Sequence, residues 1–179
     1  PLNVYGFSKF AFDNYVRRII HKAESQIMGL RYFNVYGPQE NHKMRMASVA
    51  FHLYHQLKET GKMKLFEGSE GFRRDFIHVW DAVKINLHFF ESKQSGIFNA
   101  GTGQARSFEE IATTMKRLYG SGEIEKIPFP EDLQGKYQEF TEASLDNLRL
   151  AGYTEDFMSL EEGVRHYYEQ LQTSDGRYI

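Results

Sequence analysis

The chain has 179 residues and a formal net charge of −2, with acidic and basic side chains interspersed along it. Such a balanced charge argues against a nucleic-acid-binding surface, and the length suits one domain or a large part of one. Because the chain has no cysteine, disulfides and thiolate metal sites are excluded, and we expect a soluble cytoplasmic protein without a membrane-spanning segment.

Helical and extended patterns alternate along the chain. In order, the first part predicts a helix over 5–24, a buried strand over 25–33, a turn at 35–38, a polar loop over 39–45, a helix over 46–58, a strand over 63–66 and a loop over 67–71. The second part predicts a strand over 74–79, a helix over 80–91, a strand over 96–99, a turn at 101–103, a helix with the capping box Ser107–Glu110, an extended segment over 125–130, helices near 144–150 and 159–171, and a frayed tail from Thr173. This alternation predicts an α/β fold with a mostly parallel sheet and no internal domain boundary.

The glycine-rich fingerprint of dinucleotide-binding folds is missing from the sequence. Residues 101–106 (GTGQAR) come nearest to it and lack the last glycine. If the protein binds a dinucleotide, we therefore expect the phosphate-binding half upstream of Pro1, with residues 1–179 as the C-terminal portion of a longer enzyme.

A tyrosine and a lysine at the start of the chain could carry acid–base chemistry. On a helix, Tyr5 and Lys9 lie one turn apart on the same face. A lysine ammonium stabilises a phenolate, so a tyrosine at this spacing can exchange a proton with a substrate hydroxyl. The same spacing recurs at Tyr54 and Lys58, where an exposed helix pair is the simpler interpretation.

Four blocks occur in order along the chain: residues 5–9 (YGFSK), 31–38 (RYFNVYGP), 73–81 (RRDFIHVWD) and 96–103 (GIFNAGTG). Together they resemble the C-terminal half of an extended short-chain dehydrogenase/reductase that acts on a nucleotide sugar. The resemblance covers essentially the whole chain. It implies the C-terminal part of a Rossmann-like doubly wound sheet plus a smaller α/β substrate-binding lobe.

Three further segments, residues 42–52 (HKMRMASVAFH), 66–69 (FEGS) and 135–138 (GKYQ), resemble the ADP-glycero-manno-heptose 6-epimerases. In that family NADP takes a hydride from C6 of the heptose, and the resulting ketone is reduced from its opposite face. The resemblance implies an ADP-heptose substrate used for lipopolysaccharide core assembly, NADP with NAD as the alternative, and a homo-oligomer, pentameric in the family. Met44 and Arg45 depart from the family, in which small residues are common at these positions.

The resemblance also implies a set of site residues. Tyr5 and Lys43 would serve the two faces of the sugar carbon, while Lys9, Val35 and Lys43 would contact the cofactor. Substrate contacts would come from Asn34, Arg45, His52, Phe66, Glu67, Gly68, Ser69, Arg74 and Tyr137. Arg74 suits a diphosphate because a guanidinium is a bidentate donor that stays charged. His52 and His55 have metal-compatible spacing without a carboxylate or cysteine partner, so no metal site is expected.

Two alternative functions remain open. The chain could belong to a 4-epimerase or 4,6-dehydratase acting on another nucleotide sugar. A second acid/base group at Lys43 favours 6-epimerisation, because a 4-epimerase can rotate its ketone and needs no second base. The chain could instead be a non-catalytic sugar-nucleotide-binding fragment, and we expect the 179 residues alone to turn over no substrate.

Overall fold

The structure is a computed structural model that describes residues 3–131 and 137–177. Its strands are β1 (Met28–Tyr32), β2 (Asn34–Tyr36), β3 (Lys62–Phe66), β4 (Arg73–His78), β5 (Gly96–Ala100), β6 (Ala105–Ser107) and β7 (Glu123–Ile127). Its helices are α1 (Val4–Ile19), α2 (Val49–Thr60), α3 (Val79–Ser92), α4 (Phe108–Tyr119), α5 (Asp146–Leu150) and α6 (Leu160–Ser174), with 3₁₀ turns η1 (Ile20–Lys22) and η2 (Asn41–Met46).

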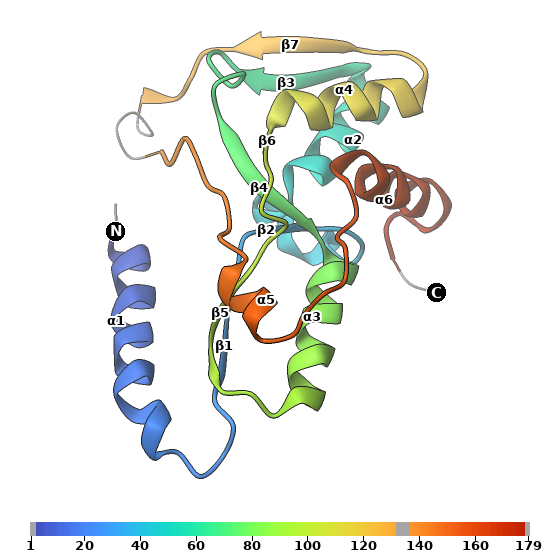
Figure 1. The fold of residues 1–179 in the computed structure, drawn as a ribbon. Coiled ribbons are helices and arrows are strands. Elements are labelled where there is room, and N and C mark those ends of the chain that lie inside the picture. Colours follow the sequence, from blue (N-terminus) through green and yellow to red (C-terminus); the bar gives the residue numbers. More distant parts are fainter. Residues whose placement is uncertain (1–2, 132–136, 178–179) are drawn as a thin grey trace.

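The described strands form three small sheets, which Figure 1 shows one above another along the molecule. β1 pairs with β5, β2 with β4 and β3 with β7, all in parallel, and β6 adds antiparallel to β4. The prediction of an α/β fold with mostly parallel strands is therefore confirmed.

Several predicted boundaries were wrong. The strand over 25–33 begins only at Met28, and the turn at 35–38 is partly strand β2. The chain changes sheets there, because the N–H of Phe33 still donates to Ala100 (3.1 Å) while Asn34 already pairs with Phe76 in β4. The loop over 39–45 contains η2, the helix over 46–58 starts at Val49, and strand β6 was missed. The frayed tail expected from Thr173 is also wrong, since α6 continues to Ser174.

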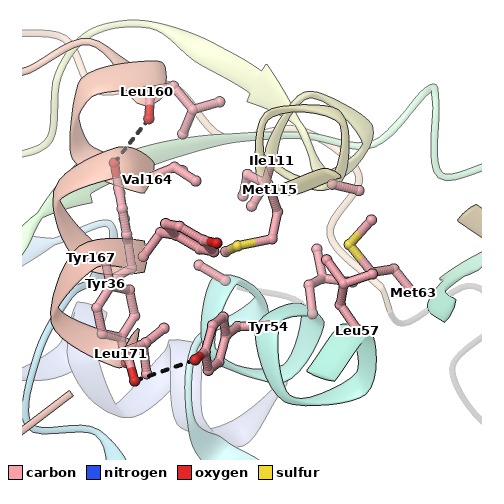
Figure 2. Close-up of a cluster of buried hydrophobic side chains, with 14 of the residues drawn as sticks. Tyr36, Tyr54, Leu57, Met63, Ile111, Met115, Leu160, Val164, Tyr167 and Leu171 are labelled. Atoms are coloured by element: carbon pink, nitrogen blue, oxygen red, sulfur yellow. Dashed lines mark hydrogen bonds between the residues drawn. The ribbon is translucent and has the colours of Figure 1, made fainter. Parts of the chain in front are cut away.

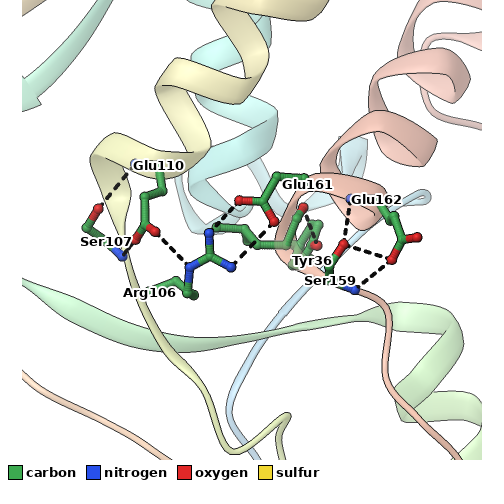
Figure 3. Close-up of polar contacts among 8 residues, drawn as sticks. Tyr36, Arg106, Ser107, Glu110, Ser159, Glu161 and Glu162 are labelled. Carbon is green, nitrogen blue, oxygen red and sulfur yellow. Dashed lines mark hydrogen bonds and ion pairs between the residues drawn. The ribbon is translucent and has the colours of Figure 1, made fainter.

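Capping boxes start two of the helices. The Ser107–Glu110 box at α4 is confirmed, and a second one joins Ser159 to Glu162 at α6. Between them, Arg106 in β6 donates to Glu110 (Nε–Oε1 2.8 Å) and pairs with Glu161. Figure 3 shows this guanidinium between the two helix starts. The arginine therefore ties β6, an edge strand of the sheet that contains β4, to α4 and α6.

The larger core lies among α2, α4 and α6 (Figure 2), with Leu57, Met115, Val164 and Tyr167 fully buried. Gly163 lets α6 approach β2, because a Cβ at this position would clash with the hydroxyl of Tyr36. A second core packs α3 and α5 against β5 around Phe89. Within the described residues, no helix combines the length and the apolar character needed to cross a membrane.

Helix α1 stands at the edge of the molecule beside β1 (Figure 1). Val16 is its single buried residue, and the ion pair between Asp13 and Arg31 ties it to β1. Large apolar side chains are exposed along it: Val4, Tyr5, Phe7, Phe10, Phe12 and Tyr15. An exposed apolar face of this size is typical of a surface that contacts other protein.

Candidate functional site

The tyrosine–lysine pair lies at the exposed start of α1. The side chain of Asn3 caps the helix by accepting the N–H of Gly6 at 2.8 Å. Tyr5 is 72% exposed, and the Nζ atom of Lys9 lies 5.1 Å from the centre of its ring. The expectation that the two side chains share one face is confirmed, and the phenol and ammonium stand together where a ligand can reach them.

Asn34 and Val35 lie where the chain passes from the sheet of β1 to the sheet of β2. Asn34 is exposed, so its amide is open to solvent, whereas Val35 is half-buried against the α3–β5 core. Parallel strands direct their carboxyl ends to one edge of a sheet, which is where open α/β folds bind ligands. The position of Asn34 just beyond β1 fits that rule.

Lys43 lies in η2, between β2 and α2. Its Nζ atom is 3.2 Å from Oε1 of Glu40, and its side chain is 40% exposed. Arg45 is exposed and, among the described residues, has neither an ion pair nor a hydrogen bond. His52 is half-buried on α2 against Phe51. Two of the predicted substrate residues and the predicted second acid/base group thus lie on one short stretch.

The backbone inside η2 is unusual. Met44 has φ 50° and ψ −128°, a conformation that glycine adopts easily and a side chain with a Cβ adopts at a cost. Strain of this kind persists only where the surroundings hold the chain in place. It falls on the residue directly after Lys43, so the direction of that lysine depends on contacts on either side of the strained position.

A buried arginine with aromatic neighbours forms a separate cluster. Arg74 is only 6% exposed, and its guanidinium lies 4.9 Å from the ring centre of Tyr137. Within the described residues, its guanidinium makes one hydrogen bond, to the carbonyl of Arg73 (3.3 Å), and has no carboxylate partner. Buried arginines are normally paired, so a guanidinium without a carboxylate partner in the described part of the chain is a candidate anion-binding group.

Two rings contact Tyr137, and a third contacts one of these two. Phe72 lies 5.0 Å from it and Phe129 lies 5.5 Å from it, while Phe66 contacts Phe129 at 5.4 Å. These flat apolar surfaces can hold a planar base or a sugar face. Sequence reasoning missed Phe72 and Phe129. Phe72 could have been found, because it lies two residues before Arg74 in the sequence.

The loop that follows Phe66 is buried at one end and exposed at its tip. Ser69 is buried, and its hydroxyl accepts from Nζ of Lys126 at 3.1 Å, whereas Glu67 and Gly68 are exposed at the tip. Gly135 and Lys136, which carry part of the sequence resemblance, lie outside the described residues. The structure therefore brings Phe66, Arg74 and Tyr137 into one cluster and leaves Glu67 and Gly68 at its rim.

These three groups of residues are not joined directly. Within the ranges that the structure describes, no hydrogen bond, ion pair or ring contact links Tyr5 to Lys43, or either of them to Arg74. Nor does this part of the chain hold three or more histidine, cysteine, aspartate or glutamate residues placed to bind a metal.

The glycine turn at 101–103 is occupied from within. The buried carboxylate of Asp75 accepts from the N–H (2.7 Å) and hydroxyl (2.8 Å) of Thr102, the N–H of Gly103 (2.8 Å) and the N–H of Ala143 (3.0 Å). A side chain on Gly101 would collide with that carboxylate. The N–H groups of Thr102 and Gly103 therefore already donate to Asp75 and are not free for a phosphate. The turn connects two segments of the fold through this carboxylate.

Comparison with known proteins agrees with these features. The model of the NAD dependent epimerase/dehydratase family matches residues 1–101. The ADP-L-glycero-D-manno-heptose-6-epimerase of Brachyspira hyodysenteriae is 58% identical over 179 residues, which are 98% of this chain and 56% of that protein.

Solved structures show the same relationship. The Helicobacter pylori ADP-L-glycero-D-manno-heptose-6-epimerase is 34% identical, with a TM-score of 0.84 over 97% of this chain and 52% of its own. The Thermotoga maritima UDP-glucose 4-epimerase with UDP-glucose is 25% identical, with a TM-score of 0.79 over 95% of this chain and 53% of its own. The chain thus spans about half the length of the relatives it matches.

Proposed function

This chain belongs to the NAD dependent epimerase/dehydratase family, and we propose that it is the C-terminal, substrate-binding part of an ADP-glycero-manno-heptose 6-epimerase. The 58% identity to a protein of that name, over 98% of this chain, carries the proposal. The UDP-glucose 4-epimerase structure shares 25%.

The cofactor of the proposed reaction is NADP, which would take a hydride from C6 of the sugar and return it. The described residues fit its nicotinamide-ribose end, because Tyr5 and Lys9 stand exposed together and Lys9 has no carboxylate partner among them. Lys9 would donate to a ribose hydroxyl, and the backbone of Val35 would border the ring. The phosphate end has no such fit, since Asp75 fills the glycine turn.

Inversion at C6 needs a proton-exchanging group on each face of that carbon. Tyr5 would accept the proton of the C6 hydroxyl on one face, with Lys9 stabilising the phenolate. Lys43 would supply the proton to the oxygen when the opposite face is used. The two groups come from different elements, α1 and η2. This is compatible with an approach to C6 from opposite faces.

The buried arginine would bind the rest of the substrate. Arg74 would take the diphosphate through charge-assisted hydrogen bonds, with Tyr137 and Phe66 against the flat parts of the nucleotide sugar. Asn34, Arg45, His52 and the tip of the 66–69 loop would frame the sugar.

The assembled enzyme would be a cytoplasmic homo-oligomer, a pentamer if it follows the heptose-epimerase family. The exposed apolar face of α1 supports additional protein contacts there. Because the glycine turn has no free N–H groups for a phosphate, the 179 residues alone are expected to turn over no substrate.

Lys43→Met in the full polypeptide that carries this sequence tests the assignment. NMR should follow inversion at C6 of ADP-glycero-manno-heptose, and the variant should lower its rate by at least about 10²-fold, as expected for a lost acid/base group. Lys58→Met is the control, because Lys58 is another exposed lysine, at the end of α2, to which the proposal gives no role. It should invert C6 at the wild-type rate.

The other outcomes separate the alternatives. Inversion unaffected by Lys43→Met would remove Lys43 from the mechanism while keeping the enzyme. Inversion at C4 of a nucleotide sugar, with none at C6, would overturn the 6-epimerase proposal in favour of a 4-epimerase.

A further inference from the structure

Glu40 is a buried acid that the proposed reaction has not used. It is 3% exposed and lies just before η2, three residues ahead of Lys43. Its Oε1 atom is 3.2 Å from Nζ of Lys43 and accepts the N–H of Ser48 at 3.0 Å. Its Oε2 atom accepts the hydroxyls of Ser48 (2.5 Å) and Tyr167 (3.2 Å).

These contacts span both sides of the strained backbone at Met44. Ser48 is the N-cap of α2, where its hydroxyl accepts the N–H of Phe51 at 3.3 Å. Glu40 therefore bonds to the residue that starts α2 and to the lysine that precedes the strained position. The stretch between them is closed into a loop by a single carboxylate.

Helix α6 anchors the other side of that carboxylate. Tyr167 is fully buried in the core shown in Figure 2, and burial together with Glu40 raises the pKa of its hydroxyl above the usual range. The hydroxyl therefore stays protonated and donates. The end of α6 adds two bonds, from the N–H of Gln39 to the carbonyl of Gly176 (2.7 Å) and from the amide of Asn41 to the carbonyl of Asp175 (2.9 Å).

We propose that Glu40 is a positioning residue that fixes the ammonium of Lys43 for proton exchange at C6, with α6 as its anchor. The proposal rests on the proposed function. Among the described residues, Glu40 is the sole hydrogen-bond or ion-pair partner of the Lys43 ammonium. A long side chain that is partly exposed has many rotamers, and the buried carboxylate selects one of them. Misplacement of a reacting group by about 1 Å can cost 10²-fold in rate.

The test is a double-mutant cycle in the full polypeptide, with C6 inversion as the readout. Glu40→Gln keeps the shape but removes the negative charge of the carboxylate, so the ion pair with the ammonium of Lys43 is lost. It should lower kcat by about 10- to 100-fold with little change in KM, because it misplaces a group that acts in the transition state. In the Lys43→Met background it should cause no further loss.

Asp81→Asn is the matched control. Asp81 is also buried, pairs with the lysine three residues later (Lys84, 3.3 Å) and accepts a backbone N–H, that of Met158, at 2.8 Å. It lies in α3, away from Lys43 in the chain. A buried acid with a structural role alone should affect kcat independently of Lys43. Its effect on kcat should therefore multiply with that of Lys43→Met.

Tyr167→Phe covers the case in which Glu40→Gln fails to fold. It keeps the buried ring and removes only the hydroxyl that anchors Glu40, so it should lower kcat severalfold, again only while Lys43 is present. Multiplicative effects for either variant, or a change confined to KM, would overturn the proposal and leave the proposed function intact. No C6 inversion by the wild type would overturn both.

Discussion

At the scale of single residues, Asp75 shows how one buried carboxylate organises a family motif. It stands in the RRDFIHVWD block that carries the resemblance, yet it faces the glycine turn of another block rather than a ligand. One carboxylate thus satisfies three N–H groups and a hydroxyl from two segments. Groups that accept several hydrogen bonds inside a protein are costly to alter, because each donor loses its partner.

Asp75→Asn should destabilise the full polypeptide by about 2–4 kcal/mol, because an amide presents a donor to N–H groups that need an acceptor. Urea unfolding measures the change in the free energy of unfolding. Asp146→Asn is the control, since Asp146 is exposed and its carboxylate accepts, from the residues that the structure describes, only the hydroxyl of Ser144. Equal destabilisation by the two variants would contradict the structural role given to Asp75.

Sequence reasoning at this scale found residues with a local signature and missed those without one. Tyr5 and Lys9 share a helix face, so their spacing alone predicts that they meet. Arg74 was predicted from its chemistry, and its burial without a carboxylate partner within residues 3–131 and 137–177 strengthens that prediction. Glu40 was missed because an acid in a polar stretch resembles any solvated charge. Its role depends on Tyr167, which lies 127 residues away in the chain.

At the scale of elements, a pair of histidines joins β4, α3 and α6. His78 ends β4 and caps α3, with its Nδ1 atom accepting the N–H of Trp80 at 3.2 Å. Its Nε2 atom must then carry the proton, and it lies 3.3 Å from Nδ1 of His166 on α6. Burial, then the neighbouring His166 and Lys84, lower the pKa of His78 to about 4.

This lowered pKa predicts a pH dependence of stability. The folded pKa lies below the unfolded value of about 6.5, so the fold requires neutral His78. The stabilisation is complete above about pH 6.5 and is lost as the pH falls from there toward 4, by up to about 3 kcal/mol. Urea unfolding at pH 7 and pH 5 should show the loss. His78→Asn, which keeps an acceptor for the α3 cap, should reduce it, and an unchanged pH dependence in that variant would refute the assignment.

Element prediction succeeded where the signal was local. The Ser107–Glu110 capping box marks the start of α4 without reference to the rest of the chain. Strands β2 and β6 have three residues each and exist because β4 lies between them, which no local pattern reveals. The 3₁₀ turn η2 was predicted as a loop for the same reason, since its shape depends on Glu40 and α6.

At the scale of the whole molecule, the described residues divide the chemistry among three places. The proposed acid–base pair is on α1, the proposed second proton-exchanging group is on η2, and the buried arginine proposed to bind the diphosphate is on β4 beside Tyr137. The α1 pair stands on a helix whose apolar face is open. The proposed substrate would place its sugar at the first two places and its diphosphate at the third.

The most direct test is a crystal structure of the full polypeptide with ADP-glycero-manno-heptose bound, in which the positions of two atoms around C6 are measured. The Tyr5 hydroxyl and the Lys43 ammonium should lie on opposite faces of C6. Each should lie within about 3.5 Å of a position that the C6 hydroxyl oxygen occupies in one of the two epimers. The diphosphate should contact Arg74. A sugar with C4 between these groups, or both groups on one face of C6, would contradict the account.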